Sequence, residues 1–184
     1  MLKRIIKSYA SYSRLLTVFI GLTAIAAFIW ILALNHPIES TDETNKIMVG
    51  VAAPGFEAID TSGRKIRISD YKGKTIIMNM WASWCPSCVK EMPLLQSVNQ
   101  LSDHHVETIY VNVGESKGTV NAFLEEHKLK IPVIIDAVGK ITGAYQVSAL
   151  PATFIIGPSG NISRVITGEI SEMDLLLNWI DEAK

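Results

Sequence analysis

One stretch of the chain, from Leu15 to Leu34, has no charged residue over twenty positions. A helix of that length spans a bilayer core of roughly 30 Å and satisfies its backbone hydrogen bonds internally. The segment before it holds four basic residues and no acidic residue: Lys3, Arg4, Lys7 and Arg14. Positive charges beside a membrane helix stay in the cytoplasm. We therefore expect a cytoplasmic tail over residues 1–14, a transmembrane anchor over 15–34 and the remainder outside the cell membrane.

A cleaved signal peptide is the alternative interpretation of this stretch. Signal peptides have an apolar core of about 7 to 15 residues, followed by a small-x-small cleavage site. Here the apolar run is longer and is followed by Asn35-His36-Pro37-Ile38. A buried helix of a soluble domain would show a polar face. An uncleaved anchor is therefore favoured, followed by a polar linker over residues 35–47 and one folded domain over 48–184.

Charge and cysteine content restrict what that domain does. The whole chain has a net charge of -1 and 48% hydrophobic residues. Nucleic-acid-binding proteins show a strong basic excess, and disordered chains have too few apolar residues for a core, so neither class is expected. Two cysteines are too few for a disulfide framework or an all-cysteine zinc site. His104 and His105 do not form a recognised ligand spacing, and we expect neither a metal nor a cofactor.

Apolar patterns in the domain predict alternating strands and helices. Alternation around Ser62-Gly63 predicts a hairpin over 56–69, and Pro158-Ser159-Gly160 predicts a second over 153–167. Further elements follow from short apolar runs and from helical spacing: strands over 75–81, 106–113 and 132–136, and helices over 85–101, 116–128 and 138–145. The order predicts an α/β fold with a mixed central sheet covered by helices on both faces.

The first and last helices carry more detailed expectations. Pro93 lies inside the first and is expected to kink it. Ser171 is expected to cap the last helix, with Asp174 completing a weak capping pattern. The apolar spacing of that helix predicts a buried stripe made of Leu175, Leu176, Trp179 and Ile180.

Both cysteines, Cys85 and Cys88, lie where the buried strand 75–81 gives way to a helix. A helix N-terminus carries about half a positive charge, which stabilises a thiolate. We therefore expect Cys85 to have a lowered pKa and to attack disulfides, and Cys88, one turn into the helix, to resolve the mixed disulfide. A purely structural disulfide is the alternative, but so small a loop constrains the unfolded chain little.

Segments besides the cysteine pair carry a resemblance to a known family. They are Ala53-Pro54-Gly55-Phe56, Tyr71-Lys72-Gly73-Lys74, the run from Trp84 to Pro93, the run from Val111 to Ser116, and Leu150-Pro151-Ala152-Thr153-Phe154. Over about residues 48–184 the chain resembles the thioredoxin superfamily, and within it the membrane-anchored, extracytoplasmic ResA/TlpA-like branch. The resemblance implies a thioredoxin-like mixed sheet flanked by helices and preceded by a single N-terminal transmembrane helix.

The resemblance also implies roles for matching residues. Cys85 and Cys88 correspond to the redox-active disulfide, with Cys85 attacking and Cys88 resolving. Pro151 corresponds to a cis-proline that faces the cysteines and holds the client backbone. Glu91 corresponds to a glutamate that manages protons beside the pair; the alternative for this residue is a solvated helix glutamate. Client contacts are implied for Trp84, Pro86, Leu150 and Pro151, and places near the site for Glu115 and Asn79.

Two positions depart from the related families. Asn79 stands where cytoplasmic thioredoxins have a buried aspartate, and an amide cannot exchange protons, so Glu91 becomes the better candidate for that task. Pro86 stands where ResA-like members often carry an acidic residue. Removing an acidic neighbour favours the Cys85 thiolate.

The function implied by the resemblance is that of an extracytoplasmic thiol-disulfide oxidoreductase that reduces client proteins. The implied client is apocytochrome c, through its haem-attachment cysteines, or else a cell-envelope or spore-assembly enzyme. Electrons would come from an integral membrane thiol carrier. Two other functions are the alternatives. A disulfide-installing oxidant usually has an inserted helical domain, for which the interval from Cys88 to Pro151 is too short. A copper-delivery module spaces its cysteines three apart and adds a distal histidine.

Overall fold

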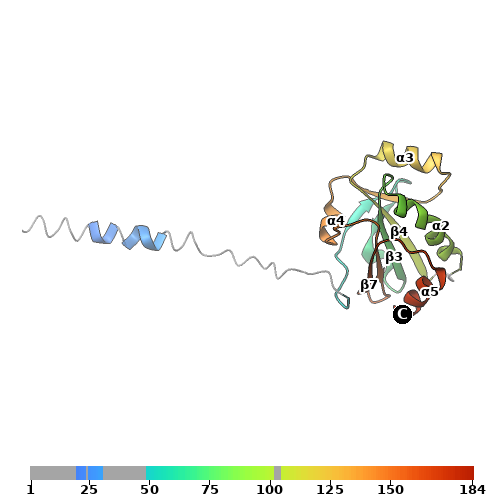
Figure 1. Ribbon diagram of the computed structural model, residues 1–184. Coiled ribbons are helices and arrows are strands. Elements are labelled where there is room, and N and C mark those ends of the chain that lie inside the picture. Colours follow the sequence, from blue (N-terminus) through green and yellow to red (C-terminus); the bar gives the residue numbers. More distant parts are fainter. Residues whose placement is uncertain (1–19, 24, 31–48, 102–104) are drawn as a thin grey trace, which may run out of the picture. The chain divides into compact units, whose positions relative to one another are not determined.

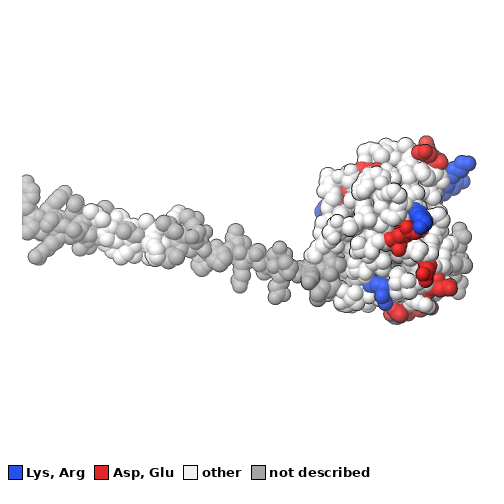
Figure 2. Space-filling model, in the orientation of Figure 1, with Lys and Arg blue, Asp and Glu red and all other residues white. Residues whose placement is uncertain are grey.

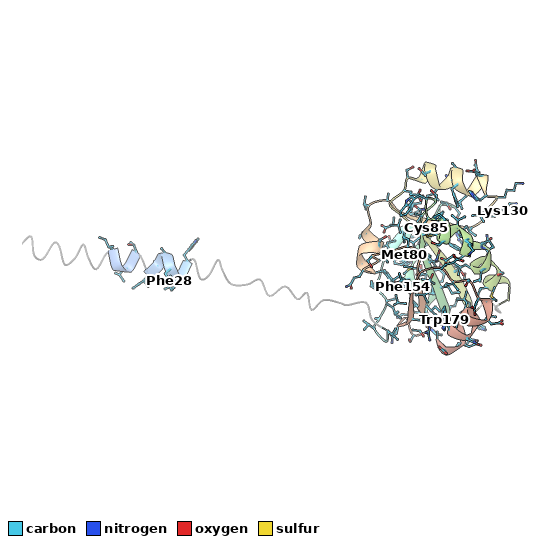
Figure 3. The ribbon with its side chains drawn as sticks, viewed as in Figure 1. Phe28, Met80, Cys85, Lys130, Phe154 and Trp179 are labelled. Atoms are coloured by element: carbon cyan, nitrogen blue, oxygen red, sulfur yellow. A yellow bond between two sulfur atoms is a disulfide. The ribbon has the colours of Figure 1, made fainter. Side chains whose placement is uncertain are left out.

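The computed structural model describes residues 20–23, 25–30, 49–101 and 105–184 (Figure 1). The chain divides into two units, Met1–Asn45 and Lys46–Lys184. In the first unit, the described residues are helical and expose apolar side chains such as Phe28, which Figure 3 labels. No helix in the described part of the chain is both long enough and apolar enough to span a membrane. The expected tail and linker, and the rest of the expected anchor, lie outside the described residues.

The second unit is built on a five-stranded sheet with the strand order β5-β4-β3-β6-β7. Its strands are β3 (Thr75–Trp81), β4 (Val106–Val113), β5 (Val133–Asp136), β6 (Ala152–Ile156) and β7 (Ile162–Thr167). Strands β3, β4 and β5 run parallel, whereas β6 is antiparallel to both β3 and β7. A separate antiparallel hairpin joins β1 (Glu57–Ile59) to β2 (Lys65–Arg67). The predicted mixed sheet and both predicted hairpins are therefore confirmed.

Helices cover both faces of this sheet, as predicted. Three of them, α2 (Pro86–Leu101), α3 (Lys117–Glu126) and α5 (Met173–Glu182), share one apolar core. The short helix α4 (Lys140–Ala144) and the 3-10 turn η1 (Ile68–Tyr71) lie against a second core. In Figure 1, α4 lies on one side of the sheet and α2 and α5 on the other.

The central strand β3 separates the two cores. Its side chains alternate between the faces, so Ile77 and Trp81 enter the core under α2 while Met78 and Met80 enter the opposite core. Every residue of β3 is buried. A strand buried on both faces needs a continuous apolar run, which is why the segment was recognisable in the sequence. Asn79 is the polar exception in the middle of this run.

The last helix begins later than the sequence predicts. Its N-cap is Glu172 rather than Ser171, and the Glu172 side chain makes no capping hydrogen bond. Asp174 does lie in the first turn, where a negative charge is favourable at a helix N-terminus. By contrast, Ser116 caps α3 by accepting a hydrogen bond from the Thr119 N–H at 3.1 Å.

The predicted buried stripe of α5 is wrong in part. Leu176 and Ile180 are buried, but Leu175 is 40% exposed. The half-buried Met173 and Leu177 complete the helical spacing instead. Trp179, also half-buried, lies under the Arg164 guanidinium, whose central carbon is 5.1 Å from the ring centroid.

Gly157, which follows β6, provides a test of how α5 docks on the sheet. A Cβ atom at this position would lie 2.6 Å from the backbone oxygen of Ala183, at the end of α5. We expect Gly157→Ala to lower the free energy of unfolding by about 1–3 kcal/mol, because backbone must shift to admit the methyl group. Denaturant unfolding of the oxidised protein measures this change.

Gly143→Ala is the matched control. Gly143 lies within α4, and a Cβ there would meet nothing within 4 Å. The same methyl group should raise stability by about 0.5–1 kcal/mol, since alanine is the better helix former. Equal effects of the two substitutions would show that the contact with Ala183 does not limit the packing of α5.

Candidate active site

The two cysteines lie at the carboxyl end of β3, in the turn that leads into α2. The Cys85 N–H donates to the Ala82 carbonyl oxygen at 3.1 Å and closes this turn. Cys85 and Cys88 form a disulfide with an S–S distance of 2.07 Å. Figure 3 labels Cys85 within the domain. Cys85 is 5% exposed and Cys88 is fully buried, so of the two sulfur-bearing residues only Cys85 presents surface to another protein.

The first turn of α2 surrounds the Cys85 sulfur with donors. The Cys88 N–H donates to Cys85 Sγ at 3.3 Å, and Ser87 Oγ lies 3.5 Å from the same sulfur. Free N–H groups and the helix dipole favour negative charge at this position. These donors agree with the expected thiolate on Cys85 after reduction of the disulfide, which stays a prediction.

The peptide bond between Leu150 and Pro151 is cis, as the resemblance implies. The register of β6 places Ala152 opposite Met80 of β3, so Pro151 lies at the end of the sheet that carries the cysteine turn. Leu150 packs against the apolar core that contains both cysteines. The geometry therefore brings the Leu150-Pro151 segment to the cysteine end of the sheet, whereas client binding by these residues stays a prediction.

Glu91 lies one helical turn beyond Cys88 on the same side of α2 and is 1% exposed. Its carboxylate accepts hydrogen bonds from Asn79 Nδ2 at 2.7 Å and from the Ile170 N–H at 2.8 Å. Burial raises the pKa of Glu91 above its ordinary value, although the two hydrogen bonds work in the opposite direction. The solvated-glutamate alternative is therefore wrong, and a buried carboxyl lies one turn from Cys88, whereas its role in proton exchange stays a prediction.

Asn79 joins Glu91 to the sheet. Its Nδ2 also donates to Thr153 Oγ1 at 3.0 Å, and the strand register places Asn79 between Thr153 on β6 and Tyr110 on β4. Among the described residues, the buried Asn79 Oδ1 and Tyr110 hydroxyl have no hydrogen-bond partner. Sequence reasoning identified Asn79 but missed Thr153 and Tyr110, because the register across strands is not visible in one sequence.

Glu115 holds the segment of backbone that leads into the cysteine turn. Its carboxylate accepts hydrogen bonds from the Ser83 N–H at 2.7 Å, from the Ser83 hydroxyl and from Asn112 Nδ2 at 2.6 Å. Burial alone would raise the pKa of Glu115, but these donors outweigh it and hold the pKa below its ordinary value. Glu115 therefore acts on the segment before Cys85, through Ser83 and Asn112, which sequence reasoning also missed.

Comparison with known proteins identifies the family of the chain. Residues 49–165 match the AhpC/TSA family. The chain belongs to this family. It is 40% identical over 127 residues to the thiol-disulfide oxidoreductase ResA of Bacillus subtilis, an alignment that covers 68% of this chain and 71% of that protein. It is 37% identical to ResA of Geobacillus thermodenitrificans, covering 78% and 84% of the two chains.

A solved structure agrees with these relatives. StoA from Bacillus subtilis superimposes with a TM-score of 0.61 and 28% identity, over 70% of this chain and 98% of that one. The protein is therefore a ResA-like thiol-disulfide oxidoreductase of the AhpC/TSA family with a thioredoxin-like fold, and its relatives imply a disulfide-bearing client protein.

The remaining predicted site residues of this oxidoreductase lie around the cysteine turn. Trp84 is 68% exposed, and its neighbour Pro86 is exposed at the start of α2.

Figure 2 shows acidic and basic side chains interspersed on one face of the domain. Within the described residues, no cluster of three or more His, Cys, Asp or Glu side chains is arranged to hold a metal ion. His104 lies outside the described residues.

The depressed pKa of Glu115 predicts how its contribution to stability varies with pH. A carboxyl whose pKa is lower in the folded protein stabilises it above the ordinary value of 4.5, and this stabilisation is lost as pH falls through the lowered pKa. We expect Glu115→Gln to cost about 1 kcal/mol near neutral pH, because the amide group cannot accept all three bonds. The difference from wild type should shrink in acid.

The raised pKa of Glu91 predicts the opposite dependence. The folded protein holds the Glu91 proton more tightly than the unfolded chain, so stability falls as pH rises from the ordinary value of 4.5 through the raised pKa. Stability of the oxidised Glu91→Gln variant relative to wild type should therefore increase with pH.

Denaturant unfolding of the oxidised proteins from about pH 3 to pH 7 measures both dependences. Glu125→Gln, at an exposed position of α3, is the control for loss of a carboxylate. Parallel stability curves for Glu91→Gln and wild type would contradict the environment described for Glu91.

Proposed function

We propose that this oxidoreductase reduces disulfides of client proteins on the outer face of a cytoplasmic membrane, and that its client is the oxidised haem-attachment cysteine pair of apocytochrome c. The observation that carries the proposed reaction is the buried Glu91 carboxyl, one turn from Cys88, and the choice of client rests on the family resemblance. A group that can accept a proton at this place serves the step in which a buried thiol must become a thiolate.

The reaction begins with the reduced pair. The Cys85 thiolate attacks one sulfur of the client disulfide, forms a mixed disulfide and releases the first client thiolate, which takes a proton from water. Glu91 then accepts the proton of the Cys88 thiol. The Cys88 thiolate attacks Cys85 Sγ, closes the Cys85–Cys88 disulfide and releases the second client thiolate. Two electrons pass from the enzyme dithiol to the client, and an integral membrane thiol carrier returns them.

The client binds across the exposed rim of the cysteine turn. Trp84 offers a large exposed apolar surface beside Cys85, and Pro86 adjoins it at the start of α2. Leu150 and Pro151 lie at the same end of the sheet. An extended client segment crossing these residues places its disulfide over Cys85. Bonds to Ser83 and Asn112 keep the Glu115 carboxylate engaged and the turn in place.

The membrane location rests on the uncharged segment 15–34 and on the four basic residues before it. With the anchor in a cytoplasmic membrane, the basic tail lies inside and the oxidoreductase domain outside. A membrane-impermeant thiol reagent, added to intact cells after reduction, should label Cys85. Labelling that occurs only after lysis would contradict this orientation.

The reduction potential of the cysteine pair in the full chain tests the direction of the reaction. We expect a value at or below that of thioredoxin, about -270 mV, because a reductant must hold a stable disulfide after the reaction. Equilibration with thiol-disulfide buffers of known potential measures it. A value near that of the strong periplasmic oxidant, about -120 mV, would favour disulfide installation instead.

Trapping tests the client. Cys88→Ser keeps the attacking thiol but cannot resolve the mixed disulfide, so it should accumulate a covalent complex with oxidised apocytochrome c. Cys85→Ser is the matched control and should trap nothing. Cells lacking the protein should lose holocytochrome c. Normal holocytochrome c, together with trapping of an envelope or spore-assembly enzyme, would replace the client while leaving the reaction unchanged.

A further inference from the structure

Val138 is an apolar side chain that projects from the domain into solvent. It is 90% exposed, more than Trp84 at 68%. Val138 is the third residue of the tight turn from Asp136 to Gly139, in which the Gly139 N–H donates to the Asp136 carbonyl oxygen at 3.2 Å. Such turns mostly use Gly, Pro, Asn, Asp and Ser, so the turn itself does not call for a valine. Single exposed apolar residues are common on protein surfaces, and the position of Val138 therefore decides its meaning.

The turn that carries Val138 lies at the cysteine end of the sheet. Strands β3, β4 and β5 are parallel; the last residue of β3 pairs with Asn112, and the last residue of β4 pairs with the last of β5. The three strands therefore end level, so the turns that follow them share one edge of the sheet. Trp84 and Cys85 lie in the turn after β3, Gly114 follows β4, and Val138 lies in the turn after β5.

The spacing between strands sets the distance from the cysteine turn to the turn of Val138. Neighbouring strands lie about 4.8 Å apart, so the ends of β3 and β5 are separated by about 10 Å. An extended chain rises about 3.3 Å per residue, so roughly three residues of a client span this interval. Gly114 lies between the two turns, is exposed, and has no side chain to obstruct a client backbone.

Hydrogen bonds hold the two turns in fixed positions. The Asp136 carbonyl oxygen also accepts from the Gly114 N–H at 3.1 Å, and the Asp136 side chain accepts from the Thr142 N–H at 2.7 Å. Gly114 directly precedes Glu115, which accepts from the Ser83 N–H before the cysteines. A preformed turn loses little conformational entropy when a partner binds, so an apolar side chain that it presents binds at low cost.

We propose that Val138 is a specificity-determining residue of this oxidoreductase. Its side chain contacts an apolar side chain of the client, about three residues from the cysteine that Cys85 attacks. The client segment extends from the rim at Trp84 over Gly114 to the turn after β5. Client disulfides that have an apolar residue at this spacing are therefore preferred. The inference rests on the proposed function, since it assigns a further contact to the client of that reaction.

A set of peptide disulfides tests this contact with the reduced full chain. Each peptide has a disulfide between two cysteines separated by two residues and otherwise contains only serine and glycine. One leucine is placed one to six residues from the nearer cysteine, on either side, and one peptide has no leucine. Acid-quenched samples separated by chromatography give the second-order rate constant for reduction of each peptide.

The expected result is a gain that depends on both the leucine and Val138. A leucine about three residues from a cysteine, on one side, should raise the rate constant about fivefold in wild type, because the contact buries apolar surface of both side chains. In Val138→Ser this gain should disappear, whereas the leucine-free peptide should react as it does with wild type. Val138→Leu keeps an apolar side chain and should retain the gain. Comparing both changes together isolates the contact from other effects of the serine.

Val49→Ser is the matched control. Val49 is 62% exposed, and the N–H of the next residue, Gly50, donates to the Ile162 carbonyl oxygen at 2.7 Å. Ile162 pairs with Ile156, at the end of β6 that lies away from the cysteines. Val49→Ser therefore removes the same exposed side chain from the other end of the sheet and should keep the full gain. Denaturant unfolding should show little change for either serine variant, because both valines are exposed.

A small chromogenic aromatic disulfide separates failure of the inference from failure of the proposed function. It has no extended chain to reach Val138, so wild type and Val138→Ser should reduce it at the same rate, and a slower variant would overturn the inference. If reduced wild type reduces neither this compound nor any peptide, the proposed function fails and the inference fails with it. If it reduces the peptides but the leucine gain is absent at every position, or persists in Val138→Ser, the inference alone is overturned.

Discussion

The buried hydrogen bond from Asn79 to Glu91 connects the central strand of the sheet to the cysteine helix. It joins the middle of the buried strand β3 to the helix that carries Cys88, and Asn79 also bonds to Thr153 on the next strand. The second Glu91 oxygen holds the backbone of Ile170, between β7 and α5. One amide and one carboxyl thus connect the sheet, the cysteine helix and the segment before the last helix.

The same oxidoreductase places two carboxylates in contrasting environments. Glu91 is buried and has a raised pKa, whereas Glu115 is partly exposed, accepts three hydrogen bonds and has a lowered pKa. Environments that separate two carboxyl pKa values separate their tasks as well. The Glu115 carboxylate holds Ser83 through hydrogen bonds that favour its ionised form, whereas burial disfavours the ionised form of Glu91.

Much of the fold and part of the site were predictable from local patterns. β3 was recognisable because both of its faces are buried, and the cysteine pair because it follows that strand at the start of a helix. The Glu91 position came from a family resemblance, and only the structure shows the carboxyl to be buried. Tyr110 and Thr153 were not predictable, because their relation to Asn79 depends on register between strands. The start of α5 was misplaced because Ser171 is a good capping residue that the backbone does not use.

The difference in burial between the two cysteines also bears on damage by peroxide. Oxidants convert an accessible thiolate first to a sulfenic acid and then, irreversibly, to higher acids. Cys85 presents the only sulfur-bearing surface of the pair, and Cys88 lies within bonding distance of it, sheltered from solvent. A sulfenic acid formed on Cys85 therefore meets Cys88 and condenses to the ordinary disulfide with loss of water. The buried cysteine thus returns an oxidised Cys85 to the normal redox cycle before it is destroyed.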